Sequence, residues 1–404
     1  MFLMMDSINE SFPDATNRPL PSNASNGSLP SNTDFSTIRL GMIPAYSVIF
    51  VLALTGNTVI IYIVKTKPYM KSTTNYLIAN MSVADLMMTF FAMPYSIAYL
   101  YVQSRWFGGF IGHVLCKLVQ FFVGLSIAAS VITLMVISLD RFFAIVYPFR
   151  RASVIRRISV TNTAIWLSSA ILLSPYLYMY QLHKLSNGSY HCIVSFGRLV
   201  DTIAIMRIYN TVTVVLLYLL PLTVIAIFYI VICRKLWLRK IPGNPSQLNR
   251  RTADRYKRCT VKMLIIVVIV FAACWFPAHL MHYYVYYRYE EFARFPPYVP
   301  LVAFWITHAH SAINPFLYIL LNRNFMHAFK DIFIKVFRGR QERTREPRCR
   351  TSWTNLSIIA SCDNIGDVPS GRRGLYDVRG RVREASVTKA VNLTNIASYP
   401  ISVE

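Results

Sequence analysis

Residues 72–103 read STTNYLIANMSVADLMMTFFAMPYSIAYLYVQ, and Asp85 is the only charged side chain in this stretch. A run of this length that is almost free of charge is typical of a helix that crosses the hydrocarbon core of a bilayer, about 30 Å thick. A carboxylate within such a helix is costly unless other groups bind it, so it usually has a function. The run therefore predicts a membrane helix with a functional site at Asp85. A purely structural role, as a hydrogen-bonding hub between helices, is the alternative.

Six further apolar runs of similar length surround this one. The chain has 404 residues, of which 54% are hydrophobic, and its mean hydropathy of +0.40 is too high for an ordinary soluble protein. The seven runs span residues 40–64, 72–103, 118–139, 158–182, 208–233, 263–287 and 295–322. They predict an all-α membrane protein, with a seven-transmembrane helix bundle over residues 40–322. Nothing resembles a repeated half, which weakens the case for a transporter built from inverted repeats.

The charge of the chain is distributed unevenly between the two sides of this bundle. Lysine and arginine number 42 against 18 acidic residues, which gives a net charge of +24. The basic residues gather after the first, third and fifth runs and in the C-terminal tail, most densely in residues 234–262. Because basic residues flank membrane helices on the cytosolic side, we predict a multi-pass plasma-membrane protein with an extracellular N-terminus. This placement favours anionic membrane lipid as a partner over nucleic acid.

Both ends of the chain are polar and are predicted to be disordered. Residues 1–39 form the extracellular end, where no signal peptide is recognisable, so the first run is expected to act as the targeting signal. Four sequons fall on the outer side and are candidate glycosylation sites: Asn9, Asn23, Asn26 and Asn187. Residues 339–404 form the cytoplasmic tail.

Two of the seven cysteines fall on the outer side of the bundle. Cys116 lies just before the third run, and Cys192 lies in the loop after the fourth. Because the outer side is an oxidising compartment, we expect these two residues to form a disulfide. Cys349, in the cytoplasmic tail, is a candidate for palmitoylation.

Each run also carries a short motif. The motifs are Gly56-Asn57 in the first run, residues 77–86 (LIANMSVADL) in the second, Asp140-Arg141-Phe142 after the third, Trp166 and Pro175 in the fourth, Pro221 and Tyr229 in the fifth, residues 274–277 (CWFP) in the sixth and residues 314–318 (NPFLY) in the seventh. In this order and spacing they resemble the rhodopsin-like (class A) family of G protein-coupled receptors. The pattern of the runs is most similar to the neuropeptide receptors of RFamide, neuropeptide Y, orexin and tachykinin type.

The resemblance implies a switch at which a heterotrimeric G protein engages. Its residues would be Asp140, Arg141, Tyr229 and Tyr318. In the active state the two tyrosines would close on the arginine. Taken alone, Arg141 is also compatible with a side chain that extends to the lipid headgroups. Family members that lock the inactive state have an acid at the base of the sixth helix, where this chain has Lys257. We therefore expect measurable signalling without ligand.

The resemblance also implies moving parts in the sixth and seventh helices. The residues of this activation core are Phe271, Trp275, Pro277, Asn314 and Pro315. Proline removes a backbone donor and clashes with the preceding turn, so it kinks a helix. A kink inside a bundle provides a hinge for rigid-body movement, with static packing as the alternative.

A polar core around Asp85 is implied as well, and it is expected to suit a sodium ion. Its residues are Asn57, Asp85, Ser126, Ser130, His310 and Ser311, joined by Asn314. Oxygen ligands of this kind suit a hard cation. His310 departs from the family, in which an asparagine is usual, and we expect it to approach Asp85. A neutral histidine packed in the core is the alternative. No other cofactor is expected.

Residues 323–338 predict a short amphipathic eighth helix. Phe325, Phe329 and Phe333 recur every four residues, with basic residues between them. This pattern is typical of a helix that lies on the membrane surface.

The mouth of the bundle indicates the class of ligand. A retinal receptor needs a lysine in the seventh helix, which residues 295–322 lack, and an amine receptor needs an aspartate where Val123 stands. The mouth is instead rich in tyrosine, whose amphipathic surface suits peptides. The predicted ligand rim consists of Asp201, His282, Glu290 and Glu291. A peptide with a basic residue and an amidated end would fit, although the rim acids equally suit a role in neutralising nearby arginines.

The predicted function is therefore a receptor that binds an extracellular peptide and activates a heterotrimeric G protein, with no catalytic site. Arrestin and receptor kinases are the expected further partners. A seven-helix transporter or channel is the alternative from another class. It would need charged residues along a continuous path, whereas apart from Asp85 and Asp140 the interior of the bundle offers no acid or base except histidine. A receptor for a non-peptide ligand is the remaining alternative.

Overall fold

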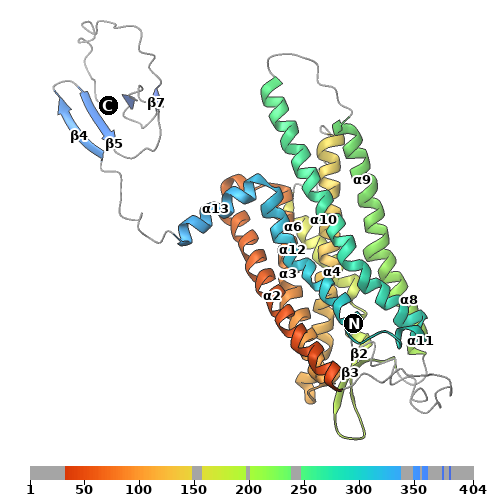
Figure 1. Cartoon of the computed structure of the whole chain (residues 1–404). Helices are drawn as coiled ribbons and strands as arrows, with labels where there is room; N and C mark the ends of the chain where they lie inside the picture. The colour runs from red at the N-terminus through yellow and green to blue at the C-terminus, as the bar shows by residue number, and fades with distance from the viewer. Residues whose placement is uncertain are drawn as a thin grey trace, which may run out of the picture. The chain divides into compact units, whose positions relative to one another are not determined.

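A computed structural model places helices over all seven apolar runs. It describes residues 32–147, 157–196, 201–237, 247–337, 349–354, 357–362, 375–376 and 382–383. The long helices are α2 (Asn32–Thr66), α3 (Thr73–Val102), α4 (Gly109–Val146), α6 (Ile158–Leu173), α8 (Thr202–Val214), α9 (Leu220–Trp237), α10 (Gln247–Tyr287) and α12 (Tyr298–Leu321). The short helices α7 (Tyr176–Met179) and α11 (Tyr289–Phe292) lie in connections, and α13 (Arg323–Phe337) follows α12. Figure 1 shows the long helices side by side in a bundle.

The chain divides into two compact units, residues 1–332 and 333–404. The first unit holds the bundle. In the second, β4 (Cys349–Thr354) pairs with β5 (Ser357–Cys362), and β6 (Leu375–Tyr376) pairs with β7 (Val382–Arg383), both antiparallel. The composition of residues 339–404 predicts no strands, so these hairpins differ from the expectation.

The predicted all-α membrane bundle is confirmed. Within the described residues, six helical segments are long and apolar enough to cross a membrane. The seventh helix of the bundle, α12, is less apolar because it carries buried polar residues, among them Thr307, His308 and His310. The fourth run was predicted to continue to residue 182. Helix α7 instead ends at Met179, because the backbone from Tyr180 onward pairs as a strand.

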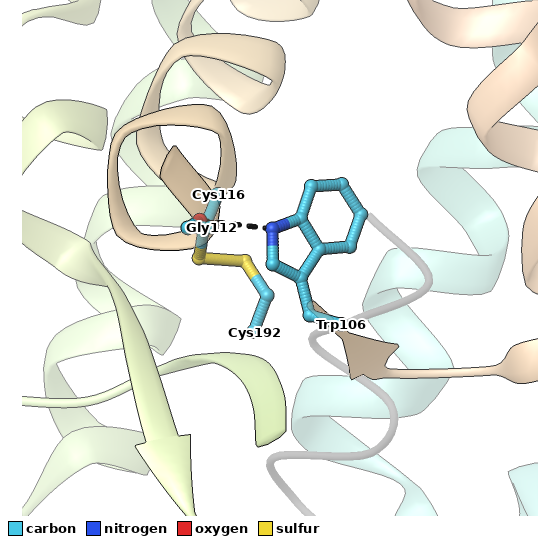
Figure 2. Close-up of a disulfide and its surroundings, with 4 residues drawn as sticks. All are labelled: Trp106, Gly112, Cys116 and Cys192. Atoms are coloured by element: carbon cyan, nitrogen blue, oxygen red, sulfur yellow. Dashed lines mark hydrogen bonds between the residues drawn. A yellow bond between two sulfur atoms is a disulfide. The ribbon is translucent and has the colours of Figure 1, made fainter. Parts of the chain in front are cut away.

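A small antiparallel sheet lies in the loops at one end of the bundle. It consists of β1 (Arg105–Trp106), β3 (Tyr190–Val194) and β2 (Tyr180–Lys184), in the order β1-β3-β2. Cys192 of β3 forms a disulfide with Cys116 of α4, which confirms the predicted pairing. Figure 2 shows Trp106 beside this bond, and its indole Nε1 donates to the carbonyl of Gly112 at 2.9 Å. The sheet is therefore fastened to the first turns of α4.

Helices α8 and α9 are joined by a π-helical turn, Val215–Leu219, just before Pro221. Proline has no N–H to offer the preceding turn, and a π-helical turn is one way in which a helix accommodates that loss. Tyr218 lies within the turn, and its hydroxyl donates to the carbonyl of Ala272 in α10 at 2.9 Å. The irregular turn thereby contacts the neighbouring helix.

Helix α10 continues through Pro277, which removes one of its backbone hydrogen bonds. Two carbonyls within the preceding turns accept hydroxyl groups from other helices. Ala272 accepts from Tyr218 at 2.9 Å, and Cys274 accepts from Thr307 of α12 at 3.0 Å. The part of α10 just before Pro277 is therefore bound by two neighbouring elements.

Helix α13 begins directly after α12, as the sequence predicts for an eighth helix. Its Phe325 is fully buried, with its ring 6.3 Å from that of Tyr318. Lys67, between α2 and α3, forms an ion pair with Asp331 at 2.9 Å. This hydrogen bond raises the pKa of Lys67. These contacts fix the first part of α13 against the bundle.

Candidate functional site

The polar core lies buried among α2, α3, α4 and α12. The members Asn57, Asp85, Ser126, Ser130, His310 and Ser311 are each at most 8% exposed. Asn314 donates from Nδ2 to the Asp85 carboxylate at 2.9 Å, and the Ser311 hydroxyl also bonds it. Ser126 instead donates to the carbonyl of Val123 in its own helix at 2.7 Å. Of the residues predicted around Asp85, Asn314 and Ser311 thus contact it directly.

Several buried atoms of the polar core have no hydrogen-bond partner among the described residues. They are Oδ1 of Asn57, Oγ of Ser130, Nε2 of His310 and Oδ1 of Asn314. Buried polar atoms are normally satisfied, so this group is suited to a small polar species. Most of these atoms are oxygens, and one carboxylate lies among them. The set fits the sodium ion that the resemblance implies.

His310 packs against an aromatic ring of the activation core. Its imidazole lies edge-on to Phe271, with ring centroids 5.5 Å apart, and Phe271 lies 5.9 Å from Trp275. The Asp85 carboxylate accepts hydrogen bonds from Asn314 and Ser311. An approach of His310 to Asp85 therefore stays a prediction. The contacts link the polar core to Trp275 through two rings.

Of the predicted switch residues, Asp140 and Arg141 lie toward the C-terminal end of α4. Arg141 donates to the Asp140 carboxylate at 2.5 Å, and Thr74 of α3 donates to the same oxygen at 3.0 Å. Tyr229 accepts from Ser138 at 3.3 Å, and Tyr318 contacts the sulfur of Met81 at 3.2 Å. None of these recorded bonds joins either tyrosine to the arginine. The arginine is therefore held by its own neighbour in this conformation.

A pocket opens between α4, α8 and α10, and Phe271 and Trp275 of the activation core form part of its wall. It contains about 830 Å³ of empty space, its open mouth included. The lining residues are Gln120, Val123, Gly124, Ile127, Leu173, Tyr176, Tyr180, Tyr209, Asn210, Thr213, Val214, Leu217, Phe271, Trp275, His279 and His282. None of them is an acid, a lysine or an arginine. A buried group that occupies this pocket is therefore expected to be uncharged.

Three polar atoms on the pocket wall have no hydrogen-bond partner among the described residues. They are Nε2 of Gln120, Nε1 of Trp275 and Nδ1 of His279. Gln120 is only 3% exposed, and the ring of His279 lies 4.4 Å from that of Tyr218. An amide and an indole N–H are donors, so the wall offers hydrogen bonds to a neutral acceptor.

The predicted rim residues have different surroundings. Asp201 caps α8, since its Oδ1 accepts from the backbone N–H of Ile203 at 2.9 Å and of Ala204 at 3.1 Å. Glu291 of α11 pairs with Arg288, the residue that precedes this helix. Glu290 is exposed, and His282 lies in the pocket wall. Two of the three acids therefore already bind groups of the chain itself.

The remaining candidate sites are only partly covered by the structure. Asn9, Asn23 and Asn26 lie outside the described residues, as does the side chain of Cys349. Asn187 is exposed at the turn between β2 and β3. Its Oδ1 accepts from the hydroxyl of Ser189 at 2.6 Å.

Several pocket residues were missed from the sequence, among them Gln120 and His279, whose side chains have atoms without a partner among the described residues. Gln120 is the one amide in the apolar stretch between Lys117 and Ser126, and His279 follows Trp275 by one helical turn. The position of Gln120 within an apolar run and the spacing of His279 from Trp275 were the available signals. Only the packing of α4 against α10 shows that both face the same pocket.

The motifs and this geometry can be compared with known proteins. The profile of the 7 transmembrane receptor (rhodopsin family) matches residues 56–318. The chain belongs to this family. The receptor is similar to the tachykinin-like peptides receptor 99D of Drosophila melanogaster, with 32% identity over 294 residues, 70% of this chain and 55% of that protein. It therefore spans about half the length of that relative.

Two mammalian relatives are covered over more of their length. The substance-K receptor of Homo sapiens is 30% identical over 293 residues, which is 72% of this receptor and 71% of the human protein. The pyroglutamylated RF-amide peptide receptor of Rattus norvegicus is 31% identical over 304 residues, 70% and 68% of the two chains. Receptors of this family are not enzymes, so the expected absence of a catalytic site agrees with the family.

Proposed function

We propose that this receptor binds an extracellular peptide in the deep pocket and activates a heterotrimeric G protein. The observation that carries the proposal is the pocket itself: its lining contains no charged residue, includes three tyrosines and ends at Trp275. Similar relatives are named as receptors for tachykinin-like peptides, substance K and RF-amide peptides. The pocket and the relatives both favour a peptide over a small charged ligand.

The end of the peptide that enters the pocket is proposed to be amidated. A free C-terminal carboxylate would be buried with no cation, which is unfavourable. A carboxamide is neutral, and its oxygen can accept from the Gln120 amide or the Trp275 indole, whose nitrogens have no partner among the described residues. Two relatives are named as receptors for RF-amide and RYamide peptides.

Signal transfer is proposed to run from Trp275 to the switch at Arg141. Trp275 connects through Phe271 to His310 and the polar core. A sodium ion is proposed as an allosteric ligand of that core, with Asp85 as its anionic partner. The receptor is proposed to lie in the plasma membrane with its N-terminus outside, where the peptide arrives. Arrestin and receptor kinases are proposed to act on its cytoplasmic side.

The proposal is tested by screening synthetic peptides against cells that express the receptor. Amidated peptides and their free-acid forms are compared, with calcium and cyclic AMP as readouts. Arg141→Ala is expected to abolish guanine-nucleotide exchange while peptide binding persists. An ion current that appears without any G protein would instead support the channel alternative. Full coupling by Arg141→Ala would show that this arginine is not the switch.

A further inference from the structure

The connection between α3 and α4 and the first turns of α4 expose large apolar side chains. Phe107 is 54% exposed, Phe110 83%, Ile111 69% and Leu115 36%. We call these four residues the loop patch. They precede the third apolar run, residues 118–139, so the sequence does not assign them to a membrane-crossing segment. A group of exposed apolar side chains of this kind marks a surface that binds a partner.

The first turns of α4 bind the rest of the chain on one side and expose the loop patch on the other. At about 100° per residue, Phe110 and Ile111 lie opposite Gly112 and Cys116 on the helix. Gly112 and Cys116 are buried, and Cys116 carries the disulfide to the sheet. The carbonyl of Gly112 accepts from Trp106 at 2.9 Å (Figure 2). The patch therefore projects away from the contacts that fasten the sheet.

Phe107 is held in place beside these turns. Its ring stacks on that of Trp106, with centroids 4.8 Å apart and planes inclined by 24°. The ring of Trp106 also lies 6.3 Å from that of Tyr95 in α3. A Cβ atom added at Gly112 would overlap the carbonyl of Phe107, so the connection passes directly against α4. The loop patch is therefore built on backbone that both helices hold in place.

Helix α3 carries an exposed stripe that leads to the loop patch. Phe90 and Tyr101 are each 54% exposed, and Pro94 and Ala98 between them are exposed as well. Residues three and four apart are neighbours on a helix surface, so these four form one stripe. Because α3 is long and apolar enough to cross the membrane, the stripe faces lipid. The connection that carries Phe107 follows directly after α3, so the patch continues a lipid-facing surface.

The length of α4 determines how far the loop patch lies from the cytosolic membrane surface. Arg141 follows the apolar run and marks that surface. At 1.5 Å per residue, Phe110 lies about 46 Å from Arg141 along the helix axis. A helix tilt of about 20° reduces this distance to about 43 Å along the bilayer normal. A bilayer with its headgroups is about 40–45 Å thick. Phe110 and Ile111 therefore come level with the outer headgroups instead of extending into bulk water.

Basic side chains accompany the loop patch. Arg105 and His113 are exposed, and residues 103–115 contain no acid. A cation next to apolar side chains is typical of a segment at the membrane interface, where the apolar groups enter the lipid and the cation binds phosphate. An apolar protein surface would offer no anion to the guanidinium group of Arg105, so phospholipid is the better match.

We propose that the loop patch inserts into the outer leaflet of the membrane and binds phospholipid there. Phe107, Phe110 and Ile111 lie at the boundary between headgroups and acyl chains, and Arg105 binds a headgroup phosphate. Because Cys116 belongs to the same turns, this contact fixes the sheet at this end of the bundle relative to the bilayer. Only the assignment to the outer leaflet rests on the proposed orientation, with the N-terminus outside.

Nitroxide labelling in phosphatidylcholine nanodiscs tests the insertion without any peptide or G protein. All cysteines outside the disulfide are replaced by alanine, and one label is introduced through Phe110→Cys or Ile111→Cys. Phe90→Cys, on the stripe of α3, is the lipid control. Ser186→Cys, exposed at the turn between β2 and β3, is the solvent control. Both patch labels are expected to collide with a water-soluble nickel chelate several-fold less often than the Ser186 label. A collision rate equal to that of the Ser186 label at either position would overturn the proposal.

Photocrosslinking on cells identifies the partner. The benzophenone amino acid p-benzoylphenylalanine is introduced in place of Phe110 or, as the control, in place of Ser186. The same substitution of Ile111 serves if the Phe110 variant does not reach the cell surface. After irradiation, mass spectrometry is expected to find a phospholipid adduct at the patch position and none at Ser186. An adduct with another protein, or the absence of any lipid adduct at the patch, would overturn the proposal.

Discussion

Asn57 donates its side-chain amide to the carbonyl oxygen of Ser311 at 2.9 Å, across the interface between α2 and α12. Pro315 follows Ser311 by four residues and has no N–H, so this carbonyl lacks its usual helical partner. The close approach needs Gly56, since a Cβ atom there would lie 2.8 Å from Cβ of Pro315. The carbonyl that Pro315 leaves without a helical partner is therefore bound by a neighbouring helix.

Substitution of Gly56 is expected to destabilise the receptor. In Gly56→Ala the added methyl would overlap Pro315, and overpacking of this kind costs about 1–3 kcal/mol. Gly41→Ala is the control on the same helix, because no atom lies within 4 Å of its added Cβ. Thermal unfolding of purified receptor should show a lower midpoint for Gly56→Ala alone. Equal midpoints for both variants would show that α2 and α12 can separate without cost.

Replacement of Gln120 is expected to weaken binding of an amidated peptide. Gln120→Leu keeps the size of the side chain but removes the amide that we propose to contact the peptide end, at a cost of about 1–3 kcal/mol. The loss should appear in the affinity of the amidated peptide, whereas the free-acid form should bind weakly to both receptors, because its carboxylate would be buried with no cation. Lys117→Leu, on the same helix and outside the pocket lining, is the control. Equal losses for both peptide forms would argue that Gln120 does not bind the amide.

The sequence predicted the bundle and the disulfide well because both depend on strong local signals. Long apolar runs identify membrane helices, and the distribution of basic residues put Cys116 and Cys192 on one side. The strand that begins at Tyr180 was missed, since its first three residues, Tyr180, Gln181 and Leu182, are uncharged and extend the fourth run. Pairing with β3, which is far less visible in sequence, decides its conformation.

The candidate sites were harder to predict than the fold. The bond between Asn314 and Asp85 followed from the motifs, whereas the pocket position of Gln120 did not. Asp201 was expected at the rim, but its role as a helix cap depends on the exact start of α8. Helix packing and helix boundaries, which a single sequence specifies weakly, account for these differences.

The role of His310 can be tested through sodium. If its imidazole approaches Asp85, its protonation would place a positive charge in the polar core and compete with the cation. Sodium should then inhibit agonist binding less at low pH, and His310→Asn should remove that pH dependence. Radioligand binding over a sodium titration at two pH values measures this. If the substitution leaves the sodium response unchanged, His310 is only a packed core residue beside Phe271.

Glycosylation of Asn187 is expected to depend on Ser189. The Ser189 hydroxyl completes the sequon, bonds Asn187 at 2.6 Å and contacts the imidazole of His191 at 3.0 Å. Ser189→Ala should remove the glycan, whereas Ser189→Thr keeps both the sequon and the hydroxyl. Because Asn9, Asn23 and Asn26 are also candidate sites, mass spectrometry of the peptide around Asn187 is the measurement. An unmodified Asn187 in wild-type receptor from the cell surface would refute this prediction.

The charge of Asp201 can be separated from its role as a helix cap. Its carboxylate accepts from the N–H groups of Ile203 and Ala204, and asparagine caps helices about as well as aspartate. Asp201→Asn should therefore preserve α8 while removing the charge, whereas Asp201→Lys removes both.

Glu290 is exposed and has no such structural role to lose, so Glu290→Lys tests charge alone. If a basic residue of the peptide binds at the rim, Asp201→Asn and Glu290→Lys should each weaken agonist potency, the latter by about tenfold or 1.4 kcal/mol. Loss of potency only in Asp201→Lys, at normal surface expression, would assign Asp201 to α8 and leave the peptide's charge independent of the rim.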